Sequence, residues 1–177
     1  MWVFLALASA LFLGIYEVFK KLSVHKNAVI PALFISTLTS SLIFLPVTIG
    51  SAYFPGLFQS IGLFVPGINF TQHVLIFLKS IIVVSSWIMA FYAVKNLPMT
   101  IASPIRATGP IWTLLGAIIF FGEHLNTQQW IGVIITLFFF FMLSTAGKSE
   151  GINFTADKWV FLIMAGTFLG AISGLYD

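Results

Sequence analysis

The sequence contains no cysteine and very little charge. Only 7% of its 177 residues are Asp, Glu, Lys or Arg, whereas a soluble domain carries about a quarter. The lack of cysteine excludes disulfides, thiolate metal sites and cysteine nucleophiles. The shortage of charge means that ionised side chains cannot cover the surface of a globule, so part of that surface must face lipid.

Several binding classes are excluded by what is missing around the few polar residues. His25, His73 and His124 are isolated in or near different loops, so we expect no metal site and no other cofactor. No basic block with interleaved aromatic residues is present, which argues against a nucleic-acid partner. The tripeptide Gly-Lys-Ser at 147–149 imitates the end of a phosphate-binding loop but lacks the glycine five residues earlier, so ATP-driven transport is not expected.

Long apolar runs dominate the chain, which is 59% hydrophobic. A helix needs roughly 20 residues to cross the hydrocarbon core of a bilayer. The sequence therefore predicts an all-α, polytopic transmembrane bundle of six helices. The predicted helices cover residues 2–22, 28–50, 73–95, 99–121, 127–145 and 158–176. Pro46 should kink the second helix. The uncharged stretch 51–71, rich in Pro, Gly and Phe, should lie on the membrane interface and could hold a short helix.

The lysines are concentrated on one side of this predicted bundle. They follow the first and third helices and flank the turn between the last two: Lys20, Lys21, Lys26, Lys95, Lys148 and Lys158. The loops on the opposite side, 51–71 and 122–126, contain no Lys or Arg. Under the positive-inside rule the lysine-rich side is cytoplasmic and the N-terminus lies outside. We expect a multi-pass protein of the cell (inner) membrane.

The first and last predicted helices repeat the same pattern at an offset of 160 residues. Three small residues at every fourth position, which let helix backbones approach closely in lipid, match in the two helices: Ala6, Ala10 and Gly14 align with Gly166, Gly170 and Gly174. The pairs Tyr16-Glu17 and Tyr176-Asp177 then align as well. We therefore expect a shared helix-packing face in both helices.

This match divides the chain into one complete repeat and the start of another. Residues 1–147 would form a five-helix repeat, 148–157 a cytoplasmic linker, and 158–177 the first helix of a second, incomplete repeat. Because five is an odd number, the second repeat would enter the membrane upside down, as in many secondary transporters. We expect the chain to be part of a longer protein. The alternative is a short protein that forms a homodimer to complete its site.

The stretch from Tyr92 to Trp130 resembles the centre of the EamA family, within the drug/metabolite transporter superfamily. The matching features are Lys-Asn-Leu-Pro at 95–98, Ser-Pro at 103–104, Pro110, and Gly-Glu at 122–123. The resemblance implies ten helices in two inverted repeats and transport of small metabolites, often outward. This chain departs from that plan by lacking four helices. Family members are also often described with a cytoplasmic N-terminus, contrary to the lysine distribution.

Few ionisable residues lie within the predicted helices, where each costs about 2.5–3.5 kcal/mol on insertion scales. Arg106 is the strongest candidate for substrate binding, because Ser103-Pro104 just before it loosens the helical hydrogen bonding and a guanidinium can hold a carboxylate. Glu17 is the second candidate. Both enter from the same side, at depths that differ by roughly 5–8 Å. Two alternatives remain open: snorkelling of Arg106 to the headgroups, and an interfacial Glu17 beside Lys20 and Lys21, with Lys21 at the favourable i,i+4 spacing.

Two aromatic residues, Tyr92 and Trp87, complete the predicted set of substrate contacts. The full set is Arg106, Glu17, Ser103, Tyr92 and Trp87. Aromatic side chains that face a cavity could stack on an apolar substrate, although interface anchoring explains them as well. We expect a secondary transporter, not an enzyme, that moves a small-molecule substrate (an amino acid or drug-like export is one option) by alternating access. The alternatives are a membrane interaction protein, a half-transporter subunit active only as an oligomer, or an intramembrane enzyme acting on a lipid.

Overall fold

The computed structural model describes residues 2–147 and 157–176, and this part of the chain is helical without strands. The helices are α1 (Trp2–Val24), α2 (Val29–Tyr53), α3 (Pro55–Ser60), α4 (Phe70–Asn96), α5 (Met99–Ala107), α6 (Gly109–Phe121), α7 (Thr127–Gly147) and α8 (Lys158–Leu175). The predicted all-α class and all six long helical segments are confirmed. The fourth predicted helix is divided into α5 and α6, and the interfacial stretch contains the short α3.

Within the described residues, four spans are long and apolar enough to cross a membrane: α2, α4, α5 with α6, and α8. The described apolar part of α7 is shorter, Thr127–Phe139. α1 is 23 residues long but ends in a group of charged residues. Large apolar side chains remain exposed along most of these helices, and lipid is the solvent that accepts such a surface. The protein is therefore a multi-pass membrane protein.

Short local signals set where the helices begin and end. The Asn69 side chain accepts a hydrogen bond from the Gln72 backbone N–H while the Gln72 side chain accepts one from Asn69, which is a capping box at the start of α4. Asn126 and Gln129 form the same reciprocal pair at the start of α7. Gly122 ends α6 in the left-handed conformation, with φ of 66°, which a glycine adopts without steric cost.

The break between α5 and α6 falls at Thr108. Pro110 has no backbone N–H, and its ring would clash with the carbonyl of Arg106 in a continuous helix. The Thr108 hydroxyl donates to the Ile105 carbonyl, with an O–O distance of 2.6 Å, so a side chain satisfies one backbone acceptor at the break. Pro104 lies inside α5 without interrupting it, and α2 likewise continues through Pro46. The interruption therefore lies just after Arg106.

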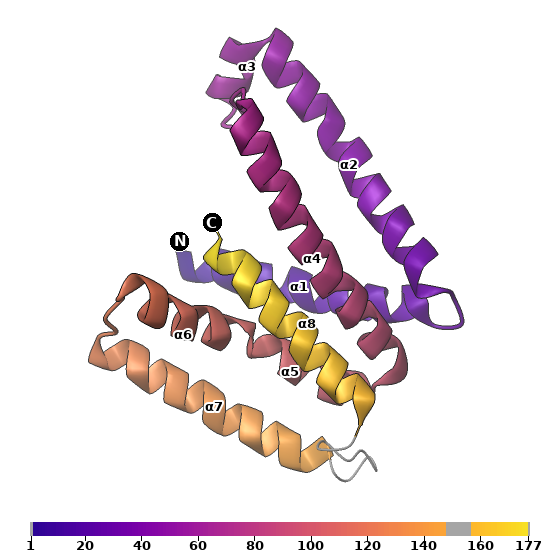
Figure 1. Cartoon of the computed structure of the whole chain (residues 1–177), viewed down its shortest axis with the longest axis vertical. Coiled ribbons are helices and arrows are strands. Elements are labelled where there is room, and N and C mark those ends of the chain that lie inside the picture. Colours follow the sequence, from indigo (N-terminus) through magenta and orange to yellow (C-terminus); the bar gives the residue numbers. More distant parts are fainter. Residues whose placement is uncertain (1, 148–156, 177) are drawn as a thin grey trace.

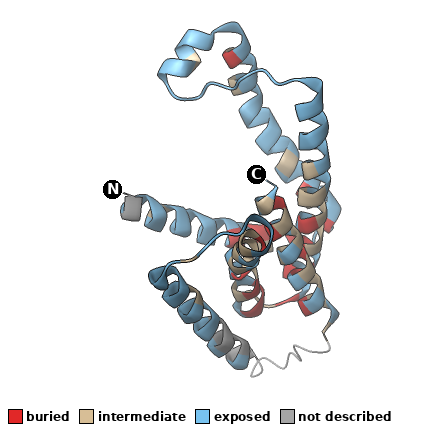
Figure 2. Cartoon of the chain, turned by 60° about the vertical axis from the view of Figure 1, so that its left-hand side comes forward, coloured by how far each residue is buried: buried red, intermediate tan, exposed pale blue. Residues whose placement is uncertain are grey.

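The packed core forms where α4, α5 and α8 meet. Figure 1 shows α8 lying along α4, with α6 on its other side. The fully buried apolar residues at this junction are Ala93, Val94, Leu97, Ile101, Ala102, Ile105, Val160 and Ile163. Figure 2 shows that burial is concentrated there, whereas α2 and the N-terminal part of α1 reach away from the core and are exposed. A second, smaller cluster joins α1, α2 and α4 through Val24, Val29, Leu33 and Phe91.

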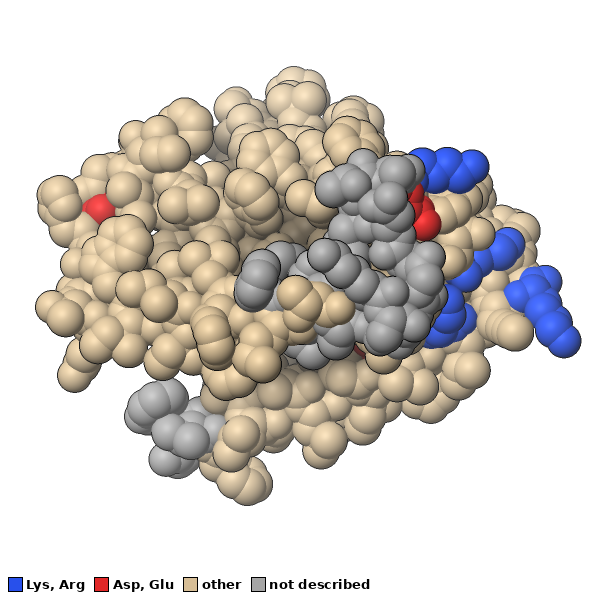
Figure 3. Space-filling model, turned by 90° about the horizontal axis from the view of Figure 1, so that it is seen from below, with Lys and Arg blue, Asp and Glu red and all other residues tan. Residues whose placement is uncertain are grey.

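The lysines hold the ends of α1 and α4 together. The Lys21 ammonium donates to the carbonyl oxygens of Val94, Lys95 and Leu97, at 2.5, 3.2 and 2.8 Å. In return, the Lys95 ammonium donates to the Asn27 carbonyl at 2.8 Å. The last carbonyls of α4 have no intrahelical partner and carry the negative end of the helix dipole, so a cation there is stabilising. Figure 3 shows the basic residues gathered on one side of this end of the molecule.

We expect Lys21→Met to lower the free energy of unfolding by about 1–2 kcal/mol, because three charge-assisted contacts are lost at a partly exposed site. Chemical or thermal unfolding of the purified chain in mild detergent measures this. Lys26→Met is the matched control, because Lys26 is exposed in the same turn. Equal stability of the two variants would mean that Lys21 does not fasten α1 to α4.

Candidate functional site

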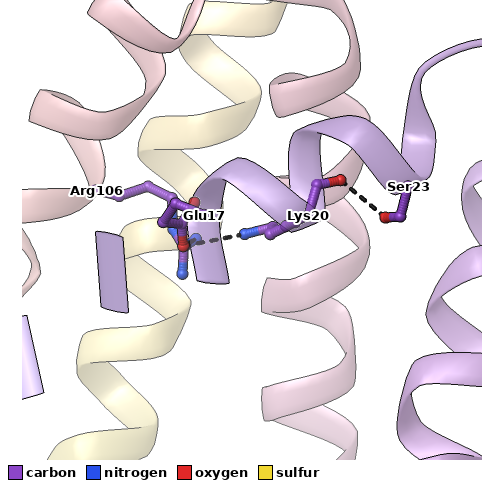
Figure 4. Close-up of polar contacts among 4 residues, drawn as sticks. All are labelled: Glu17, Lys20, Ser23 and Arg106. Carbon is purple, nitrogen blue, oxygen red and sulfur yellow. Dashed lines mark hydrogen bonds and ion pairs between the residues drawn. The ribbon is translucent and has the colours of Figure 1, made fainter. Parts of the chain in front are cut away.

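The candidate site is an ion cluster where α1 crosses α5. Glu17 of α1 and Arg106 of α5 form an ion pair through Glu17 Oε1, although they are 89 positions apart in the sequence. The Lys20 ammonium approaches the same oxygen at 3.6 Å. Figure 4 shows Arg106 and Lys20 reaching Glu17 from opposite sides. One carboxylate is thus shared between two cations.

Lys20 is the most deeply buried member of the cluster. Its side chain is 2% exposed, against 12% for Glu17 and 29% for Arg106. It lies one helical turn after Glu17, so both side chains leave α1 on the same face. The Lys20 ammonium also lies over the ring of Phe91 on α4, 4.9 Å from its centre, and 5.7 Å from that of Tyr16. These distances permit cation–π attraction.

The cluster carries more positive than negative charge. One carboxylate, one ammonium and one guanidinium sum to +1 (−1 +1 +1) when all three are ionised. Both cations contact Oε1, and Oε2 is buried with no hydrogen-bond partner among the described residues. A buried charge is costly unless it is paired. The cluster therefore has one more cation than anion, and one of its carboxylate oxygens can still accept a hydrogen bond.

Cavities lie on both sides of Glu17. A cavity of about 210 Å³ beside Arg106 is bordered by α4, α8 and the α5–α6 break, and polar groups of Ser86, Thr113 and Thr167 line it. A cavity of about 620 Å³ beside Lys20 lies between α1, α2 and α4 and is mostly apolar. A third, of about 290 Å³, lies between Tyr16, Trp87 and α2. Each cation of the cluster thus borders its own cavity.

The structure brings together only part of the predicted substrate-contact set. Arg106 and Glu17 are paired, and Trp87 lines the small cavity together with Arg106. Tyr92 and Ser103 are both exposed, and neither is among the residues that line the cavities described above. Asp177, the predicted counterpart of Glu17, lies outside the described residues.

The two predicted packing faces have different surroundings. On α8, Gly166 lies against the backbone of α4 and Gly170 against the Ser86 hydroxyl. Gly174 faces the side chain of Thr113 on α6. On α1, by contrast, no heavy atom of the described residues, apart from the adjoining backbone of α1 itself, lies within 4 Å of a Cβ placed on Gly14. A groove runs over that face past Ala10, and Ala6 is exposed.

A comparison with known protein families matched the EamA-like transporter family over residues 1–145. The chain belongs to the EamA-like transporter family. The resemblance inferred from Tyr92 to Trp130 is therefore confirmed. Comparisons with curated proteins and with solved structures gave no match. The match covers α1 to α6 and most of α7, including all three members of the ion cluster.

From the sequence, Lys20 was placed beside Glu17 in the interfacial alternative but not among the predicted substrate contacts. It was assigned to the basic end of α1, where lysines normally reach water. Its spacing of three from Glu17 was the available signal, because residues at i and i+3 share a helix face. The sequence alone could not show that α2 and α4 would cover that face.

Proposed function

We propose that this member of the EamA-like transporter family is a secondary transporter that moves a small metabolite by alternating access. The observation that carries the proposal is the Glu17–Arg106 ion pair, which joins two helices beside a polar cavity. Alternating access requires contacts that can be exchanged between two states rather than permanent packing. An ion pair with a cavity next to it meets this requirement, because a ligand carboxylate can replace Glu17 on Arg106.

The way α1 attaches to the rest of the chain supports this role. Its N-terminal half is exposed, and its attachments lie near its C-terminal end, at the ion cluster, Lys21 and the Val24 cluster. A helix held at one end can change its angle while its anchored end stays in place. In the proposed cycle, substrate binding at Arg106 releases Glu17 and lets α1 move relative to the α4–α8 core.

The proposed domain plan is one five-helix repeat, residues 1–147, followed by the first helix of a second, inverted repeat at 158–177. The packing of α8 on α4 and α6 supports it, because the first helix of a second repeat would need such a contact with the first repeat. The corresponding face of α1 is open in the described chain, which favours a partner that covers it. That partner would be a second repeat or another copy of this chain.

Counterflow in vesicles tests the proposal. The purified 177-residue chain is reconstituted, vesicles are loaded with a pool of unlabelled metabolites rich in organic acids, and entry of labelled acids from that pool is followed. We expect transient accumulation of at least one labelled acid that needs no ATP. Empty vesicles, and vesicles containing the protein with both Glu17 and Arg106 neutralised, are the controls. Entry no faster than in these controls for every acid of the pool would overturn the proposal for this chain.

A further inference from the structure

We infer that the cavity of about 620 Å³ beside Lys20 is a binding site for a small organic anion, a carboxylate carried on an apolar body. This site is separate from the Arg106 cavity, and its occupation does not require transport. The volume lies within the roughly 300–1,000 Å³ typical of small-molecule sites. Its lining combines one buried cation with mostly apolar walls, which is the composition such a ligand would need.

The charge of the cavity comes from Lys20. The ammonium is almost completely buried, and in residues 2–147 and 157–176 its one carboxylate partner, Glu17, is 3.6 Å away and already paired with Arg106. Lys20 Nζ lies over the rings of Phe91 and Tyr16. These rings compensate its positive charge only partly, because cation–π contacts are weaker than an ion pair. A bound anion would bring the cluster from +1 to zero. The site therefore favours an anion over a neutral or cationic ligand of the same shape.

The walls of the cavity favour an apolar body on that anion. Tyr16, Phe19 and Phe91 contribute rings, and α2 contributes a side that contains Ile35 and Ser36. Burial of an apolar ligand surface here contributes roughly 25 cal/mol per Å² removed from water. Apart from Ser36 on the α2 side, the neutral polar side chains of the lining are Ser23 and Asn27, which border the cavity at its basic end. A ligand would thus place its carboxylate at Lys20 and its apolar part along α2.

Two sources share this chemistry, a water-soluble carboxylate and an anionic lipid whose chain lies along α2. The test therefore includes a lipid arm. The purified full chain is placed in nanodiscs of phosphatidylcholine, and binding of labelled 4-phenylbutyrate is measured by equilibrium dialysis, with protein-free discs to subtract partitioning. The amide of the same acid is the neutral probe. A second set of discs contains phosphatidylglycerol.

We expect the acid to bind and the amide to bind at least about tenfold more weakly. Lys20→Met should weaken acid binding about 10–100-fold, and Lys20→Arg should retain most of it. Lys26→Met should leave it within about threefold of the unaltered chain, because Lys26 is exposed and is not part of the cavity lining. Ser36→Trp keeps Lys20 but fills the cavity from α2 and should also abolish binding. This second variant tests the site if Lys20→Met does not fold.

Equal binding of acid and amide would overturn the inference, as would retained acid binding in folded Lys20→Met. No binding of the acid in phosphatidylcholine discs would also overturn it. Competition by phosphatidylglycerol would support the anion site and identify a lipid as its occupant, whereas undiminished binding would support a soluble ligand. Because no transport is measured, failure here leaves the counterflow result to be judged separately.

Discussion

Replacing Arg106 by alanine is expected to reduce counterflow to the level of empty vesicles while the protein still inserts into the membrane. Arg106 provides the cation that faces the polar cavity between α4, α6 and α8, and a charged hydrogen bond to substrate is worth about 1.5–3 kcal/mol, or roughly 10–150-fold in rate. The change also leaves Glu17 with only Lys20 at 3.6 Å. Initial rates of labelled substrate entry, normalised to inserted protein, provide the measurement.

The matched control separates substrate binding from simple stabilisation. In the double variant Glu17→Gln with Arg106→Met, the cluster keeps its net charge of +1, because Lys20 alone remains. If the arginine only balanced Glu17, removal of both partners would restore transport, since replacing a buried pair by neutral groups is often tolerated. We expect the double variant to fold and to remain inactive. Transport at the unaltered rate in Arg106→Ala, or its recovery in the double variant, would contradict the proposed role.

The helices were predictable because lipid imposes a simple rule on a chain. A span must satisfy its own backbone hydrogen bonds and expose apolar side chains, so runs such as 73–95 and 158–176 are visible without any knowledge of tertiary contacts. The division at Thr108 was less visible. Ser103-Pro104 was expected to loosen the helix, but α5 continues through Pro104. The interruption follows from Pro110, whose ring would clash with the Arg106 carbonyl four residues earlier in a continuous helix.

The candidate site was predictable in its members but not in its contacts. Counting residues from the membrane edge placed Glu17 and Arg106 at similar depth, and the structure pairs them. Which helices touch depends on crossing angles and side-chain shape, and the sequence does not state either. Lys20 was missed for the same reason, because its burial depends on α2 and α4. Tyr92 and Ser103 were named from residue type and neighbourhood, and neither property determines the direction of a side chain.

Gly166→Leu is expected to prevent normal seating of α8 on α4. A Cβ at Gly166 would lie 3.0 Å from the Ser86 carbonyl oxygen and 3.3 Å from the Ala90 nitrogen, and these are backbone atoms that cannot rotate away. The Ser86 hydroxyl also donates to the Gly166 carbonyl at 2.7 Å. We expect the free energy of unfolding to fall by about 3 kcal/mol or more. Unfolding in detergent, together with loss of a cysteine cross-link introduced between α4 and α8, measures the effect.

Gly14→Leu is the matched control, because Gly14 is the helical glycine of the same small-residue pattern on α1, at the step that aligns with Gly174, and has open space around it among the described residues. Both changes replace a helical glycine by the same better helix former, so their difference reports the surroundings alone. We expect the free energy of unfolding of Gly14→Leu to lie within about 0.5 kcal/mol of that of the unaltered chain, or slightly above it. Equal destabilisation of the two variants would contradict the prediction, because Gly14 lacks the contact with α4 that is expected to cause the effect at Gly166. A Gly14→Leu chain that is stable yet fails to transport would mean that another helix must cover this face of α1 during the cycle.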